Sequence, residues 1–174
     1  MKKLIILLVI LGAAFTSISA QKIVYVDTQV ILASLPEYQD AQKEIDLITE
    51  RWQKQIQDSY DEIDRMYRAY QAEEIILSPD DKKKREEDII QAEKELKDMQ
   101  KAKFGHEGEL FQKRKELVKP IQDKVYEAIS KMAKQRAYDF VLDKSSGISI
   151  LFANNEFDKT AEVMKSLGIE TADD

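Results

Sequence analysis

A long stretch without helix-breaking residues constrains this fold more than any other feature. Between Pro36 and Leu77 the chain contains no Gly and no further Pro. Because Pro is tolerated in the first turn of a helix but not in its interior, this stretch predicts one helix of roughly 60 Å that starts near Pro36. Ser78 and Pro79 then predict a tight turn and the cap of a second long helix, which we expect to run from Pro79 towards Tyr138. Two long helices joined by a tight turn form an antiparallel hairpin.

The apolar residues of both expected helices alternate by three and four, which is the spacing of a coiled-coil seam. If the hairpin turns at Ser78, Trp52 faces Phe104 and Tyr60 faces Leu96. Several polar residues interrupt the seam, so we expect a helical but flexible arm over residues 36–119, with its tip near residues 75–85. The seam positions are Ile45, Ile48, Trp52, Ile56, Ser59, Ile63, Met66 and Tyr70 on the outgoing helix, and Ile89, Ala92, Leu96, Met99, Lys103, His106, Leu110, Lys113 and Leu117 on the returning one.

The two ends of the chain predict a small β-rich body. Residues 22–27, 140–142 and 148–152 are rich in β-branched and aromatic residues and read as strands, with a turn at residues 144–147. Asp27 or Thr28 can cap a short helix, and Asp158 can cap a last helix that stops at Gly168. The predicted body covers residues 21–35 and 120–174. Because so small a core is marginal and its sheet has open edges, we expect the body to be completed by oligomerisation.

Residues 1–20 have the layout of a secretory signal peptide. Lys2 and Lys3 precede an apolar run from Leu4 to Phe15, and small residues follow up to Ala20. The run is short for a membrane span, so we expect cleavage after Ala20 rather than an uncleaved anchor. An exported chain without Cys suits a bacterial periplasm, where ATP is not available.

The composition excludes several classes of function. The formal net charge is −6, which argues against nucleic-acid binding because phosphate neutralisation needs a basic surface. With no Cys and a single His, thiolate chemistry and His-rich metal sites are excluded, and no nucleotide-binding or hydrolase motif occurs. We therefore predict that the protein is not an enzyme and has no cofactor or metal site.

The ordered set of segments resembles the Skp/OmpH family of periplasmic chaperones. The resemblance rests on Lys22–Asp27, Leu35–Tyr38, Pro120–Ile129, Tyr138–Asp143, Ile148–Phe152 and Asp158–Gly168, which together span essentially the whole chain after the leader. It implies an α+β fold in which a small β body forms a jellyfish-shaped homotrimer and three long antiparallel coiled-coil arms enclose a cavity. It also implies an ATP-independent holdase that binds unfolded outer-membrane β-barrel proteins and prevents their aggregation. The alternative is a structural coiled-coil adaptor or spacer of the cell envelope that binds a folded partner.

The charge of the arm departs from the best-known members of that family, which are strongly basic. Residues 40–77 contain 5 Lys+Arg and 10 Asp+Glu, and residues 78–119 contain 12 and 11, so the arm carries a net charge of −4. Capture of clients or lipopolysaccharide by general positive charge is therefore not expected here.

A second apolar stripe beside the seam is our candidate surface for client binding. Tyr60 and Tyr67 lie seven residues apart on the outgoing helix, and Ile90, Phe104, Phe111 and Val118 keep multiples of seven on the returning helix. Our hypothesis assigns client contact to Tyr60, Tyr67, Phe104 and Phe111, together with Ile75 and Ile76 at the tip. The alternative is a wide core stripe that only thickens the helix–helix interface.

Two other features admit a structural and a functional interpretation. Gly105 and Gly108 each weaken a helix interior by about 1 kcal/mol, and Pro120 removes one helical hydrogen bond, so all three are candidate hinge positions. The basic run Lys82–Arg85 at the tip could touch anionic membrane lipid, but the flanking acidic residues favour a solvated helical turn.

Overall fold

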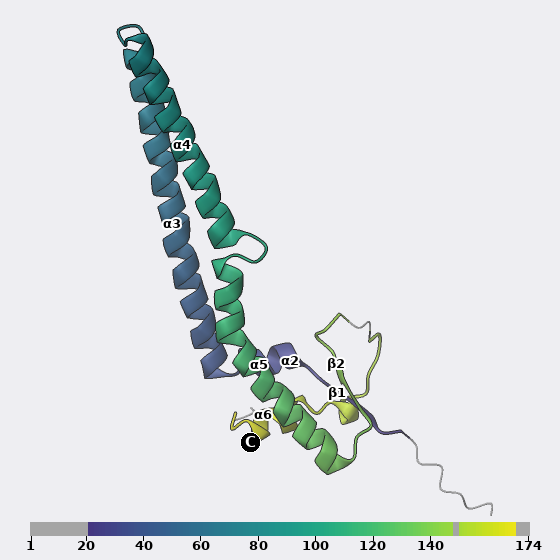
Figure 1. Cartoon of the computed structure of the whole chain (residues 1–174). Helices are drawn as coiled ribbons and strands as arrows, with labels where there is room; N and C mark the ends of the chain where they lie inside the picture. The colour runs from purple at the N-terminus through teal and green to yellow at the C-terminus, as the bar shows by residue number, and fades with distance from the viewer. Residues whose placement is uncertain (1–20, 148–149, 170–174) are drawn as a thin grey trace, which may run out of the picture.

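The computed structural model describes residues 21–147 and 150–169 and is mostly helical (Figure 1). Three long helices and a small body at one end make up the structure. Two of the helices pack along much of their length, and the third continues the second. The elements in chain order are β1 (Ile23–Val26), α2 (Thr28–Ala33), α3 (Pro36–Glu73), α4 (Pro79–Phe104), α5 (Glu109–Arg136), β2 (Phe140–Asp143), the 3-10 helix η1 (Asn155–Phe157) and α6 (Thr160–Ser166).

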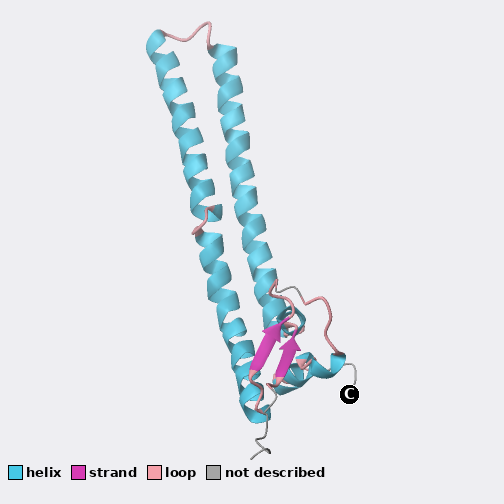
Figure 2. Cartoon of the chain, turned by 90° about the vertical axis from the view of Figure 1, so that its right-hand side faces the viewer, coloured by secondary structure: helices cyan, strands magenta, loops and turns pink. Residues whose placement is uncertain are grey.

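The helix α3 leaves the body, and α4 and α5 return beside it in the opposite direction (Figures 1 and 2). Pro36 occupies the first turn of α3, where its missing N–H has no intrahelical partner to lose. The Ser78 side chain caps α4 by accepting a hydrogen bond of 3.2 Å from the Asp81 backbone N–H. Within the part of the chain that the structure describes, no helix is long and apolar enough to cross a bilayer.

The interface between the helices follows the predicted seam except at His106, which lies exposed in the loop between α4 and α5 because the helix is interrupted there. Ile45, Ile89 and Leu96 are buried, with 1%, 5% and 6% of their surfaces exposed. The expected contact between Trp52 and Phe104 is present, because the two rings meet edge to face with centroids 6.1 Å apart. The Tyr60 hydroxyl lies one helical turn beyond the expected Leu96 and accepts a hydrogen bond of 2.9 Å from the Gln100 side chain.

The prediction of one continuous helix from Pro79 to Tyr138 is wrong. The helix ends at Phe104, residues 105–108 form a loop, and a new helix begins at Glu109. Two glycines in four residues, each unfavourable in a helix, stand where the backbone approaches itself too closely for any other side chain. By contrast, α5 continues through Pro120, although Figure 1 shows it bending between its hairpin half and its body half.

The body packs β1, β2, α2 and α6 around the last half of α5. The two strands are parallel, with Ile23 opposite Phe140 and Val26 opposite Asp143. Parallel neighbours need a crossover connection, and here that connection is the entire hairpin. The core residues come from β1, α2, α3, α5 and α6 and from the residue before α3: Val26, Ile31, Leu35, Ala41, Ile121, Val125, Met132 and Val163.

Side-chain hydrogen bonds join the two ends of the chain within the body. The Asp143 carboxylate at the end of β2 accepts hydrogen bonds from the Thr28 hydroxyl at 2.7 Å and the Ser145 hydroxyl at 2.8 Å. The Thr160 hydroxyl oxygen accepts a hydrogen bond of 2.9 Å from the Asp27 backbone N–H. Asp27 caps α2, as predicted, through the Val30 backbone N–H at 3.0 Å.

The prediction of a strand over residues 148–152 fails for its described part. Ile150, Leu151 and Phe152 form an irregular segment between β2 and η1, and residues 148–149 lie outside the described residues. A strand is maintained by hydrogen bonds to a neighbour, but β1 pairs with β2 and, through Tyr25, with Asp158, and neither strand pairs with this segment. The expected leader and its cleavage after Ala20 also lie outside the described residues.

Candidate functional site

Four side chains of the second apolar stripe lie on one flank of the hairpin. The Tyr60 hydroxyl contacts Gln100, and Gln100 shares a helix face with Phe104, four residues later. Tyr67 repeats the position of Tyr60 after seven residues, and Ile90 precedes Phe104 by fourteen, so these two occupy the same flank. We call this set, Tyr60, Tyr67, Ile90 and Phe104, the flank row.

The flank row is partly packed and partly open to solvent. Tyr60 and Tyr67 are each 49% exposed, Ile90 is 63% exposed and Phe104 is 36% exposed. Phe104 is the most covered member because its ring stacks against Trp52. These exposed fractions are apolar surface that the hairpin itself leaves uncovered, whereas the seam residues Ile45, Ile89 and Leu96 are buried.

The other two stripe residues fall beyond the helix break and behave differently. Phe111, on α5, is 49% exposed, so its ring is also open to solvent. Val118 is only 7% exposed. At Val118 the burial agrees with the alternative of a core stripe, and Val118 begins the run of buried α5 residues that continues with Ile121 and Val125.

The tip carries the most exposed apolar residues of the hairpin. Ile75 and Ile76 lie in the turn after α3 and are 95% and 83% exposed. In the neighbouring basic run, Arg85 forms an ion pair with Glu73 at 3.1 Å, and Lys83 lies 3.8 Å from Glu87. These pairs support the interpretation of the run as a solvated helical turn.

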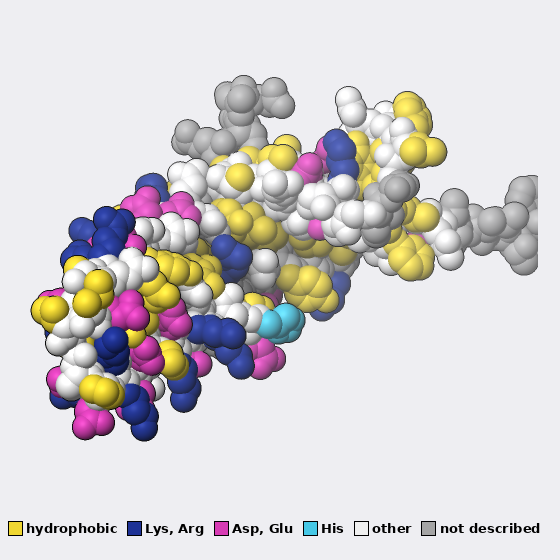
Figure 3. All heavy atoms as spheres, turned by 90° about the horizontal axis from the view of Figure 1, so that it is seen from above, with side chains coloured by type: hydrophobic (Ala, Val, Ile, Leu, Met, Phe, Trp, Pro, Cys, Tyr) yellow, Lys and Arg dark blue, Asp and Glu magenta, His cyan; other side chains and the backbone are white. Residues whose placement is uncertain are grey.

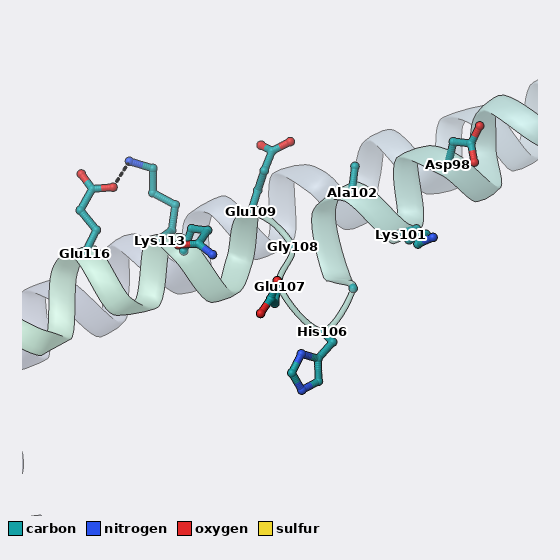
Figure 4. Close-up of a pocket in the computed structure, with 11 residues that line it drawn as sticks. Asp98, Lys101, Ala102, His106, Glu107, Gly108, Glu109, Lys113 and Glu116 are labelled. Atoms are coloured by element: carbon teal, nitrogen blue, oxygen red, sulfur yellow. Dashed lines mark hydrogen bonds and ion pairs between the residues drawn. The ribbon is translucent and has the colours of Figure 1, made fainter.

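The helix break forms an open groove of about 740 Å³ on the returning side of the hairpin. Its lining is mostly charged, and Figure 4 shows His106 pointing away from the helices at the end of the loop. His106 is exposed, and no cluster of His, Asp and Glu side chains among the described residues could hold a metal ion. The groove, whose lining residues are all described, therefore lacks the ligand set of a metal site.

The body has an apolar concavity that the sequence did not reveal as a surface. It encloses about 980 Å³ beside the β1–β2 sheet, and its walls include Ile23, Tyr25 and Leu142. Phe152, from the predicted third strand, also lines it and is 87% exposed, and the neighbouring Leu151 is 97% exposed. Figure 3 shows hydrophobic side chains gathered at that end of the molecule as well as along the arm.

Hydrogen bonds between elements shift the pKa values of Asp143 and Tyr70. Burial raises the pKa of Asp143, but the hydrogen bonds from Thr28 and Ser145 outweigh it and hold that pKa below its ordinary value of 3.8. At the tip end of the hairpin, the hydrogen bond to Glu86 raises the pKa of Tyr70 from 10.0 to about 12, with burial contributing in the same direction.

The sequence matches the protein family described as "Outer membrane protein (OmpH-like)" over residues 22–167. The chain belongs to this OmpH-like family. The resemblance noted from the sequence is thereby confirmed, and because the family is not an enzyme family, the prediction of a non-enzymatic protein holds as well.

A solved structure has the same fold as this OmpH-like chain. It is a crystal structure from Caulobacter crescentus CB15 assigned as an OmpH-like outer membrane chaperone, and it superimposes with a TM-score of 0.69. The two sequences are 11% identical, and the match covers 86% of this chain and 85% of the other. Among curated proteins, none matches this sequence. At such low identity the likeness establishes the fold of the OmpH-like chain and nothing more specific.

Sequence reasoning located the flank row but missed the concavity of the body. The signal for the row was its heptad spacing beside the seam. The signal for the concavity was available in the apolar run Ile148–Phe152, which adds more apolar side chains than a two-stranded sheet in so small a body can bury.

Proposed function

We propose that this protein is an ATP-independent holdase chaperone of the periplasm, which binds unfolded outer-membrane β-barrel proteins and prevents their aggregation. The observation that carries the proposal is the flank row: apolar surface, about half open to solvent, along a hairpin whose seam residues Ile45, Ile89 and Leu96 are buried. Membership of the OmpH-like family supports the choice of client, and the description of the Caulobacter structure as an OmpH-like outer membrane chaperone supports the chaperone role.

The proposed division of labour follows the fold. Residues 36–119 form the arm, whose tip lies near residues 75–85, and residues 21–35 and 120–174 form the body. Residues 1–20 are a leader that directs export and is removed after Ala20. On the arm, Tyr60, Tyr67, Phe104 and Phe111 contact the client, with Ile75 and Ile76 adding a contact at the tip.

An open strand edge and exposed apolar side chains of the body support a homotrimer as the working unit. A single chain leaves the outer edge of β2 and the side chains of Phe140, Leu151 and Phe152 exposed, at 52%, 97% and 87%. Edges and apolar patches of this kind are normally covered. Packing of three bodies through this face would cover them and set three arms around one cavity.

The energetics suit holding without energy input. An aromatic side chain presents roughly 200 Å², so a ring that is half exposed can gain up to about 2.5 kcal/mol by burial against a client. Each such contact alone is weak and exchanges quickly, whereas contacts from several arms add through high effective concentration. Release then follows when folding or membrane insertion offers the client a lower free energy.

Anionic lipid is a less favoured partner of the tip. Between Glu73 and Asp88 the chain has four cationic residues against seven acidic ones, and two of the four cations form the ion pairs described above. The net charge of the tip is thus negative and would oppose attraction to an anionic bilayer.

The decisive experiment removes the exposed aromatic surface and measures holding. Tyr60, Tyr67, Phe104 and Phe111 are changed together to Ser, and light scattering follows the aggregation of a urea-unfolded outer-membrane β-barrel protein after dilution. We expect the quadruple variant to lose protection. The matched control is Leu47→Ser, since Leu47 is an apolar residue of α3 that is 61% exposed but lies outside the row.

Two accompanying measurements separate the interpretations. Circular dichroism at 222 nm must show an intact hairpin, because a loss of helicity would mean that the aromatic rings serve the interface instead of the client. Native mass spectrometry should show a trimer that becomes a three-to-one complex with the unfolded client. A trimer that ignores unfolded clients and binds a folded envelope protein would establish the adaptor instead.

A further inference from the structure

The loop at residues 105–108 interrupts the returning side of the hairpin between α4 and α5. We propose that the loop at residues 105–108 is a joint of the hairpin, and that the Lys103 ammonium, held between Trp52 and Glu109, is the clasp that keeps the joint closed. This inference does not depend on the proposed function, because its tests need no client.

The backbone hydrogen bonds show where the joint can move. The Gly105 N–H still donates to the Lys101 carbonyl at 2.9 Å, which completes α4. The Gly108 N–H donates to the Gly105 carbonyl at 2.9 Å, so the loop closes on itself. Few backbone bonds thus join α4 to α5 directly, and the long helical ladder that would make the returning side rigid is interrupted here.

The two glycines explain why the helix breaks at this position. A Cβ on Gly105 would lie 2.3 Å from the Lys101 carbonyl oxygen, and one on Gly108 would lie 2.8 Å from the Ala102 carbonyl oxygen. Real side chains do not approach backbone so closely, so the compact loop requires Gly at both positions.

The clasp joins three parts of the hairpin at one point. The Lys103 ammonium lies 4.7 Å from the centre of the Trp52 ring on α3 and 2.7 Å from the Glu109 carboxylate at the start of α5. Lys103 itself belongs to the last turn of α4. Its side chain is only 22% exposed, although most charged side chains of the hairpin ion pairs are more than 40% exposed. A single cation therefore holds α3, α4 and α5 together across the break.

The position of Lys103 explains an anomaly of the seam. A Lys at a seam position weakens a coiled coil, and the sequence predicts a local defect there. In the structure the charge is accommodated because the aromatic face attracts the ammonium and the first-turn carboxylate of α5 neutralises it. Both contacts are partly open to solvent, so each is weak and salt-sensitive, and the clasp can open reversibly.

Opening should be visible as a change in the distance between α4 and α5. The natural chain contains no Cys, so spin labels attach only where Cys is introduced. Gln91→Cys on α4 and Gln112→Cys on α5 place labels on exposed positions on either side of the break. Gln53→Cys and Gln71→Cys, both on the continuous helix α3, form the control pair.

Lys103→Met is the test variant, because it keeps the aliphatic stem and removes the charge. We expect it to raise the population of open joint about 3- to 10-fold, seen as a broader and shifted distance distribution between positions 91 and 112. High salt should have the same effect on the parent protein, and Lys103→Arg should restore the closed distribution. Lys101→Met, an exposed neighbour on α4, should leave it unchanged.

A second readout uses the only Trp of the sequence. Because Trp52 is in contact with Lys103, its fluorescence emission should change in Lys103→Met and stay constant in Lys101→Met. An unchanged 91–112 distribution in Lys103→Met, with helicity intact, would overturn the proposal. Equal broadening in the α3 control pair would also overturn it, since this would mean a general loosening of the hairpin instead of motion at a joint.

Discussion

Replacing Ile45 by Ala tests whether the closed seam carries the stability of the hairpin. Ile45 is 1% exposed and lies on the seam face of α3. The change removes three carbon groups, worth about 0.8 kcal/mol each in transfer free energy, and leaves a cavity that adds to the loss. The better helix propensity of Ala returns up to about 0.5 kcal/mol. The free energy of unfolding should therefore fall by about 2–4 kcal/mol.

The control is Leu47→Ala, two residues further along the same helix. Leu47 is 61% exposed, so its removal should change the free energy of unfolding by less than about 1 kcal/mol. Urea unfolding followed by circular dichroism at 222 nm, at one protomer concentration for all variants, gives both values. Equal destabilisation by the two substitutions would refute the assignment of seam and solvent faces on α3, and with it the flank row.

Three further predictions concern the joins between elements. The pKa of Tyr70 is raised to about 12, so its contribution to stability is complete below pH 10 and is lost as the pH rises from 10 to 12. Tyr70→Phe cannot form the hydrogen bond to Glu86 and should flatten this alkaline loss of stability in a pH series of thermal melts. The pKa of Asp143 is lowered, so its contribution to stability is present above about pH 4 and is lost as the pH falls through its folded value. Asp143→Asn should be less stable near pH 7 and should lose less stability in acid. If its stability falls in acid as steeply as that of the parent protein, the hydrogen bond to Thr28 contributes nothing. Gly105→Ala should lower the urea midpoint, since the new Cβ would lie 2.3 Å from a backbone oxygen, and an unchanged midpoint would mean that the loop rebuilds without strain.

Features that depend on a few neighbouring residues were predictable from the sequence. The Ser78 cap, the Pro in the first turn of α3 and the Asp27 cap each depend on a few neighbouring residues, and all are present. The contact between Trp52 and Phe104 followed from heptad spacing and the position of the turn. A helical repeat determines which side chains meet once the turn is known.

Features that depend on competition between distant parts were not predictable in the same way. Two glycines lower helix stability by about 2 kcal/mol, which alone does not decide between a weak helix and a break. The structure decides for a break, with Lys103 joined to Trp52 and Glu109 around it. Similarly, the β propensity of Ile150–Phe152 reports fitness for a sheet surface, and a strand forms only where a neighbour supplies hydrogen bonds.

The sequence by itself determined the family, the long helices, their caps and the spacing of the seam, because these follow from composition and from periods of a few residues. Only the tertiary structure decided that Val118 is core while Tyr60 and Tyr67 remain half open, because exposure depends on where α5 leaves the hairpin and enters the body. It also decided that β1 and β2 are parallel neighbours. These strands are more than a hundred residues apart, so their pairing depends on how the intervening helices fold back.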